Sequence, residues 1–284
     1  MYKKIGSILL IGIMAGVLTG CGSQEVSTGN SDKTEITIFA AKSLNSVMEE
    51  LITQYEGIHP DVTIIGNYDS SGTLLAQIEE GAACDIFFSA AQSQMDKLQD
   101  KDKLIVEGTR HNVVNNQVCV VTQMDSDTKA TGLLTMGDAA SLAIADGSVP
   151  VGKYTRKALL ATDILTKVED PTTITTQQIS EAFGDVEINE CANVGAVTAA
   201  ISEGANEVGT IYKSDTYGFE DKIKILEVIS YDLTGDVIYP IAQVVNQEAD
   251  KAEQQEALKF IDFLISKDAK VIFEKYYFDT EVTD

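Results

Sequence analysis

The chain has 284 residues, of which 44 are acidic and 21 basic, giving a formal net charge of −23. This balance argues against nucleic acid as a partner, because binding it depends on Lys and Arg that neutralise phosphates. The four cysteines form no C-x-x-C pair, so a zinc site or a disulfide framework is poorly supported.

Residues 1–20 have the pattern of a secretion signal. Lys3 and Lys4 precede an apolar stretch that is short for a membrane-spanning helix. The sequence LTGC, ending at Cys21, predicts cleavage before this cysteine and acylation of its thiol, as in bacterial lipoproteins. An ordinary signal peptide with an incidental cysteine is the alternative. Residues 21–34 are polar and rich in Ser and Gly, which predicts a flexible tether. We therefore expect an extracytoplasmic protein that is lipid-anchored to the bacterial cell membrane.

The first elements after the tether alternate between strand and helix. Buried strands are predicted at 36–41, 62–66 and 85–89, and helices follow Ser43, as an N-cap, and Ser71. Strands that are apolar throughout are typical of an open parallel sheet with helices on both faces. The sequence therefore predicts an α/β fold for this part of the chain.

A second α/β series follows. Its predicted elements are strands at 117–121 and near Leu142, helices after Pro150 and at 194–201, strands at 208–212, 224–229 and 237–242, and a helical segment at 249–276. We expect two lobes with a ligand cleft between them. Residues 35–113 and 246–284 are assigned to lobe 1, and residues 114–245 to lobe 2.

Four positions share one physical feature, because Ser43, Ser71, Val151 and Val194 each open a predicted helix. Helix starts leave backbone N–H groups unpaired and carry partial positive charge, so they attract anions. In open α/β sheets such starts gather beyond the carboxyl ends of the strands. Each start alone is weak support for a site.

The sequence GSVPVGKY at Gly147–Tyr154 differs by one residue from a phosphate-binding P-loop. A P-loop has Ser or Thr after Gly-Lys to hold magnesium, and Tyr154 cannot serve. Pro150 also removes one backbone donor. A nucleotide-binding enzyme using this segment is therefore the weaker hypothesis, and Lys153 is expected to be a solvated lysine.

A series of motifs over nearly the whole chain after the tether resembles the periplasmic molybdate-binding proteins, the type II periplasmic-binding-protein receptors of molybdate ABC transporters. FAAKSL, which ends at Leu44, is similar to the family pattern F-A-A-x-S-L. The other matching segments are SSGTLLAQI from Ser70, GAACDIFFSAA from Gly81, VPVGKYTRKAL from Val149, VGTIYKSD from Val208, YPIA from Tyr239 and the closing residues 263–278.

The resemblance implies an oxyanion site at five positions. Ser43 and Ser71 would contribute hydroxyl and backbone N–H groups, Val151 and Val194 backbone N–H groups, and Tyr212 its hydroxyl. These groups would contact the oxygens of molybdate and not the metal atom. The site would draw on both lobes, as a clamp that closes by a hinge motion requires. The expected partners are the anion and an ABC permease, with no cofactor and a monomeric chain.

Neutral donors suit molybdate, a fully ionised tetrahedral dianion that can accept hydrogen bonds but donate none. Tungstate nearly matches molybdate in size and charge, so the sequence leaves both open. Fixed donors would disfavour the smaller sulfate, although a receptor for sulfate or phosphate remains an alternative.

Four residues depart from the family pattern. Val151 replaces a usual Ala, which should matter little because it contributes a backbone donor. Lys42 and Asp69 place charges beside the two Ser motifs, and the simpler expectation is that both face solvent. Tyr277 stands where the family usually has Gly, so we expect a rearranged last turn.

An enzyme is not expected from this sequence. His59 and His111 are predicted in loops, and neither belongs to an H-E-x-x-H motif. The sequence also contains no G-x-S-x-G elbow.

Overall fold

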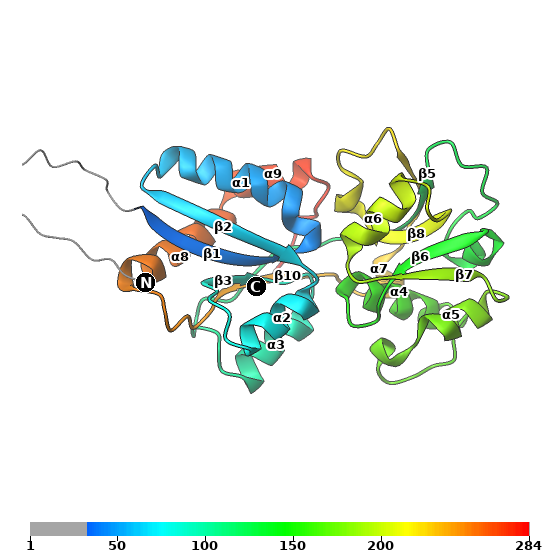
Figure 1. Cartoon of the computed structure of the whole chain (residues 1–284), viewed down its shortest axis with the longest axis horizontal. Coiled ribbons are helices and arrows are strands. Elements are labelled where there is room, and N and C mark those ends of the chain that lie inside the picture. The colour runs from blue at the N-terminus through cyan, green and yellow to red at the C-terminus, as the bar shows by residue number, and fades with distance from the viewer. Residues whose placement is uncertain (1–32, 284) are drawn as a thin grey trace, which may run out of the picture. The chain divides into compact units, whose positions relative to one another are not determined.

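The computed structural model describes residues 33–283. The signal sequence, Cys21 and nearly all of the tether lie outside the described residues. In the described part the strands form two five-stranded sheets, each flanked by helices (Figure 1). The predicted two-lobed α/β fold is confirmed. No helix within the described range has the length and apolarity needed to cross a membrane.

The first sheet has the strand order β2-β1-β3-β10-β4. Its strands are β1 (Thr34–Ala41), β2 (Val62–Asp69), β3 (Ile86–Phe88), β4 (His111–Val114) and β10 (Tyr239–Gln243). The first three are parallel, as predicted, and β10 runs antiparallel between β3 and β4. The assignment of 114–245 to lobe 2 is therefore wrong for β10, which completes the first sheet. The remaining lobe boundaries stay predictions.

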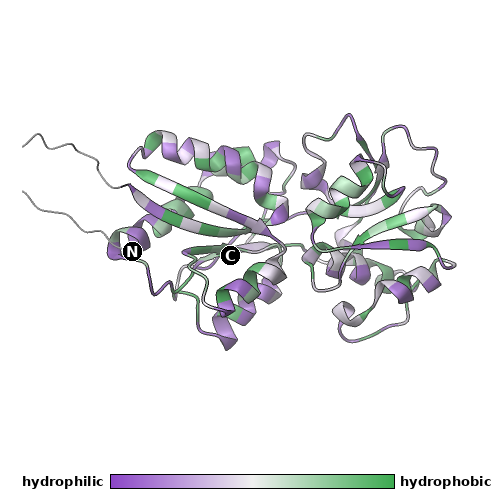
Figure 2. Cartoon of the chain, in the orientation of Figure 1, coloured by the Kyte–Doolittle hydropathy of each residue, from purple (hydrophilic) through white to green (hydrophobic). Residues whose placement is uncertain are grey.

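Alternation along the strands divides the core of this sheet between its two faces. Ile38 and Phe88 belong to one hydrophobic cluster, whereas Phe39 and Phe87 belong to another. The first face is covered by α1 (Asn45–Ile58), α8 (Lys251–Leu264) and α9 (Lys267–Lys275), and the second by α2 (Ser71–Glu79) and α3 (Gln92–Asp96). Figure 2 shows the apolar residues concentrated along the strands and on one side of several helices.

The second sheet has the order β7-β6-β8-β5-β9. Its strands are β5 (Val118–Gln123), β6 (Ser141–Ala145), β7 (Glu187–Cys191), β8 (Val208–Tyr212) and β9 (Ile223–Val228). Helices α4 (Pro150–Ala161) and α6 (Val194–Ser202) cover opposite faces of β8. Thr155 of α4 donates its hydroxyl hydrogen to Thr210 Oγ1 at 2.9 Å, whereas a Cβ on Gly209 would lie 3.0 Å from Ile201 of α6.

The remaining elements are short. They are α5 (Thr176–Ala182), α7 (Tyr231–Thr234), the 3₁₀ helices η1 (Lys42–Leu44), η3 (Leu133–Asp138), η4 (Pro171–Thr173) and η5 (Lys213–Thr216), and the π-helical η2 (Lys97–Lys101).

Several local predictions were wrong. No strand was predicted directly before Val194, but the structure has the edge strand β7 there. Only Cys191 of this strand is buried, so no apolar pattern could reveal it. His111, predicted in a loop, begins β4. The C-terminal helical segment is two helices, because Ser266 caps α9 through a hydrogen bond from Ala269 N–H.

The chain passes between the two sheets at residues 115–117 and again at 229–238. These crossings are joined to each other, because Asn115 Oδ1 accepts the backbone N–H of Val237 at 2.8 Å. A second link lies next to it, where Asn115 Nδ2 donates to Asp236 Oδ1 at 3.1 Å. The two crossings are thus hydrogen-bonded to each other, and the hinge motion of the lobes stays a prediction.

Candidate ligand-binding site

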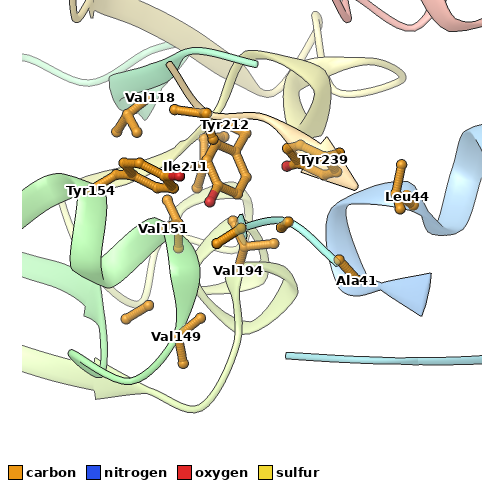
Figure 3. Packing of buried hydrophobic residues seen from close by; sticks show 14 of the residues in the cluster. Ala41, Leu44, Val118, Val149, Val151, Tyr154, Val194, Ile211, Tyr212 and Tyr239 are labelled. Atoms are coloured by element: carbon orange, nitrogen blue, oxygen red, sulfur yellow. The ribbon is translucent and has the colours of Figure 1, made fainter. Parts of the chain in front are cut away.

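One small pocket, which we call the cleft pocket, brings together all five residues predicted to bind an oxyanion. It is lined by Ala41, Lys42, Ser43, Ser70, Ser71, Ala90, Val149, Pro150, Val151, Val194 and Tyr212. The pocket encloses about 210 Å³ of empty space, part of which is open to solvent. Figure 3 shows Val151, Val194 and Tyr212 around this point, with Tyr239 beside Tyr212. That these residues bind an anion stays a prediction.

Three helices begin at the cleft pocket. Ser70 caps α2 by accepting Thr73 N–H at 3.1 Å, and the first helical hydrogen bond is donated by Leu74. The amides of Ser71 and Gly72 therefore precede the helical ladder. Such amides carry the partial positive charge of the helix start.

The starts of α4 and α6 follow the same pattern. In α4, Pro150 occupies the first position, where it has no N–H to lose, and the first helical donor is Lys153. In α6, Asn193 caps the helix by accepting Ala196 N–H at 3.0 Å. The amides of Val151 and Val194 thus precede their helical ladders.

Gly152 explains why the start of α4 needs the sequence V-P-x-G. A Cβ at this position would collide with the backbone carbonyl oxygens of Ala145 and Asp146. Arg156, which is fully buried, fastens the same turn by donating to Ala145 O at 2.8 Å and to Gly152 O at 3.0 Å. Together the two residues hold the strand end of β6 against the beginning of α4.

Tyr212, the last residue of β8, presents an unsatisfied hydroxyl. The side chain is 1% exposed, and its hydroxyl oxygen has no hydrogen-bond partner among the described residues. Burial raises the pKa of Tyr212 well above its ordinary value, so the phenol stays protonated and can donate. A buried donor without a partner costs free energy unless a ligand satisfies it.

Ser43 does not cap α1, contrary to prediction. It lies in η1, and its hydroxyl shares a 2.8 Å hydrogen bond with the hydroxyl of Tyr239. Tyr239 oxygen also accepts from Asn116 Nδ2 at 3.2 Å. Either hydroxyl can be the donor of the bond between Ser43 and Tyr239. If the fully buried Tyr239 hydroxyl donates to Ser43 Oγ, the Ser43 hydrogen is left for the cleft pocket.

The Ser71 hydroxyl is held in a similar way. Its oxygen accepts the backbone N–H of Ala90 at 2.9 Å, and the side chain is fully buried. Because a hydroxyl can accept and donate at once, the hydrogen of Ser71 remains available to the pocket that this residue lines. Both predicted serines are thus oriented by partners that the sequence analysis did not identify.

The electrostatic environment of the cleft pocket favours an anion. No carboxylate lies among the described residues that line it, and Lys42 is the charged one. Asp215 lies behind, where its Oδ2 accepts Tyr212 N–H at 3.2 Å. Burial raises the pKa of Asp215 to about 7, and the Tyr212 N–H and the charge of Lys42 oppose that rise.

The departures from the family pattern are not placed as expected. Lys42 lines the cleft pocket, and Asp69 is hydrogen-bonded to Asn193, so neither simply faces solvent. Lys153, expected to be solvated, is partly exposed and donates to Ser93 Oγ at 3.2 Å in an exposed hydrogen bond. Tyr277 has a φ of 65°, the left-handed conformation that glycine favours, and a rearranged last turn stays a prediction.

Sequence reasoning missed Tyr239, Asn116 and Asp215 as supporting residues. Tyr239 and Asp215 fall inside matching segments, so a signal was present, but nothing in the pattern gave either of them a role. No group of three or more His, Cys, Asp or Glu that could hold a metal ion occurs in the part of the chain that the structure describes.

The two-sheet α/β fold, with helix starts converging on a small donor-lined pocket, defines a solute-binding protein. The chain belongs to the bacterial extracellular solute-binding protein family, which it matches over residues 36–279.

Similar proteins with names narrow the family assignment to a kind of receptor. The chain is 31% identical over 99% of its length, and 100% of the relative, to YvgL of Bacillus subtilis (strain 168), named as an ABC transporter substrate-binding lipoprotein. It is 32% identical over 87% of its length, and 90% of the relative, to the molybdate-binding protein ModA of Escherichia coli (strain K12). The predicted resemblance to molybdate-binding receptors is confirmed.

Solved structures agree on the fold. A substrate-binding domain assigned to a molybdenum ABC transporter of Clostridium difficile has 30% identity and a TM-score of 0.62, covering 87% of this chain and 99% of that one. The sulfate-binding protein SubI of Mycobacterium tuberculosis H37Rv has 14% identity and a TM-score of 0.65, covering 86% of each chain, and shows the fold alone. The protein is therefore a substrate-binding component of an ABC transporter and not an enzyme.

Proposed function

We propose that the protein captures molybdate in the cleft pocket and delivers it to an ABC permease, with tungstate as a second ligand. The observation that carries the proposal is the buried Tyr212 hydroxyl, which has no hydrogen-bond partner among the described residues and lies where three helix starts converge. A tetrahedral anion at this point would accept from Tyr212 and from the amides of Ser71, Val151 and Val194. It would also relieve the cost of the unsatisfied hydroxyl.

The donors select for the charge state of the ligand. Phosphate retains a proton on at least one oxygen at neutral pH, and that proton needs an acceptor. Among the described residues, no carboxylate lines the cleft pocket to accept this proton. Molybdate, tungstate and sulfate carry no proton and suit a site made of donors. Among these three, the ligand size that the fixed amides accept decides the preference.

The names of the relatives support molybdate. The ModA relative is molybdate-binding by name, and the related solved domain is assigned to a molybdenum transporter. The sulfate-binding SubI shares the fold at low identity, so the fold itself leaves the anion open.

A thermal unfolding experiment tests the proposal on residues 22–284. Molybdate, tungstate, sulfate, phosphate and Mg-ATP are added one at a time. A ligand at about 100 times its Kd adds about 2.7 kcal/mol to the free energy of unfolding. For a chain of this size each kcal/mol raises Tm by roughly 2–4 °C. We expect a large rise with molybdate and tungstate alone. A rise in Tm with sulfate or phosphate instead would mean that the protein binds that anion and not molybdate. A rise in Tm only with Mg-ATP would overturn the proposal.

The lipid anchor at Cys21 belongs to the same proposal, supported by the LTGC sequence and by the lipoprotein name of YvgL. In cells, Cys21→Ser is expected to move the protein from the membrane fraction to the soluble fraction. Continued membrane association of the variant would rule out acylation of this thiol as the anchor.

A further inference from the structure

A side-chain hydrogen bond joins the two lobes at the edge of the cleft pocket. Asn193 Nδ2 donates to Asp69 Oδ1 at 3.0 Å. Asp69 is the last residue of β2 in the first sheet, and Asn193 precedes α6 over the second sheet. Each residue stands next to a helix start at which an anion ligand is proposed.

The same carboxylate oxygen connects two helix caps. Asp69 Oδ1 also accepts the backbone N–H of Ser70 at 2.7 Å, and Ser70 is the cap of α2. Asn193 uses its Oδ1 to cap α6, which leaves its amide hydrogens to reach Asp69. A single oxygen therefore fixes the start of α2 relative to the start of α6.

Lys42 contacts the same turn of α6. A Cβ on Gly195 would lie 3.1 Å from Cγ and 3.0 Å from Cε of Lys42, so the lysine stem packs directly against this glycine. Lys42 precedes Ser43 in η1 of the first lobe. Both charged residues that depart from the family pattern thus approach α6 at its first turn.

We propose that Asp69 and Asn193 form a clasp, as positioning residues that hold the lobes in register and slow release of the bound anion. The proposal rests on the proposed function. A carboxylate beside an anion site repels the ligand, so its charge alone would weaken binding. The clasp offsets this repulsion, because a contact made only in the closed arrangement raises the population of that arrangement.

Three substitutions separate the effect of the Asp69–Asn193 hydrogen bond from the effect of the charge on Asp69. Asn193→Ser keeps a helix cap but removes the amide donor. Asp69→Asn removes the charge but keeps an acceptor oxygen, and Asp69→Ala removes both. Ser93→Ala is the matched control, because it deletes the exposed cross-lobe hydrogen bond from Lys153 and leaves the helix caps intact.

The dissociation rate of molybdate, measured by stopped-flow displacement, is the main readout. We expect Asp69→Ala and Asn193→Ser each to raise it about tenfold, equivalent to about 1.4 kcal/mol. The double variant should also be about tenfold faster, because both changes break one contact. Asp69→Asn and Ser93→Ala should stay within about twofold of the unmodified chain. A roughly hundredfold effect in the double variant, or slower release in Asp69→Ala, would overturn the clasp.

A second readout separates failure of the clasp from failure of the proposed function. If the unmodified chain binds none of the anions, the proposed function fails, and the clasp is then judged by amide hydrogen exchange without added anion. Faster exchange at both 69–73 and 193–197 in Asp69→Ala supports the clasp. Faster exchange confined to 69–73, or unchanged exchange in both segments, overturns it.

Discussion

The substitution Tyr212→Phe should affect stability and ligand affinity in opposite directions. The Tyr212 side chain is 1% exposed, and its hydroxyl has no hydrogen-bond partner within residues 33–283, so the free protein bears the cost of a buried unsatisfied donor, about 1–3 kcal/mol. Removing the hydroxyl should therefore stabilise the protein without ligand. In the complex the same hydroxyl would donate to a dianion, an interaction worth about 1.5–3 kcal/mol. The variant should therefore bind molybdate roughly 10- to 150-fold more weakly.

Two assays read the two effects. Thermal unfolding without ligand should give a higher Tm for Tyr212→Phe, by roughly 2–4 °C per kcal/mol. Isothermal titration with molybdate should give a higher Kd.

Tyr55→Phe is the matched control, because Tyr55 is equally buried but donates to Glu256 at 2.6 Å, away from the cleft pocket. That change should lower Tm and leave the Kd unaltered. A lower Tm for Tyr212→Phe together with an unchanged Kd would refute the reasoning.

Three further predictions follow from the surroundings of the pocket. Tyr239→Phe should weaken molybdate binding about tenfold in titration, because the Ser43 hydrogen loses the partner that directs it to the pocket; equal affinity would contradict this orientation. Asp215→Asn should remove part of the pH dependence of stability. The carboxyl has a pKa of about 7 when folded and an ordinary value near 3.8, so the folded state holds an extra proton between these values. The free energy of unfolding therefore falls as pH rises through that window, and urea unfolding at several pH values should show a flatter slope in the variant. Gly152→Ala should lower the free energy of unfolding by about 1–3 kcal/mol and weaken molybdate binding, because the added Cβ collides with two backbone carbonyl oxygens. A variant with unchanged stability and unchanged Kd would show that the turn relaxes easily.

Much of the fold follows from local patterns. The strands β1 to β3 and the starts of α2, α4 and α6 are predicted because continuous apolar runs and helix-opening residues are local features of the sequence. The edge strand β7 was missed because its burial pattern is mostly exposed. The antiparallel β10 was assigned to the wrong lobe, because chain order cannot reveal that the chain returns to the first sheet before its last helices.

The sequence by itself determined the family resemblance, the helix starts and the five predicted site residues, which all line the cleft pocket, since each lies in a short contiguous motif. Only the tertiary structure decided how those residues are supported. Ser43 meets Tyr239 across 196 positions, and Asp69 meets Asn193 across 124. A hydrogen bond depends on distance in space, and a pattern of neighbours along one chain holds no information about such a distance.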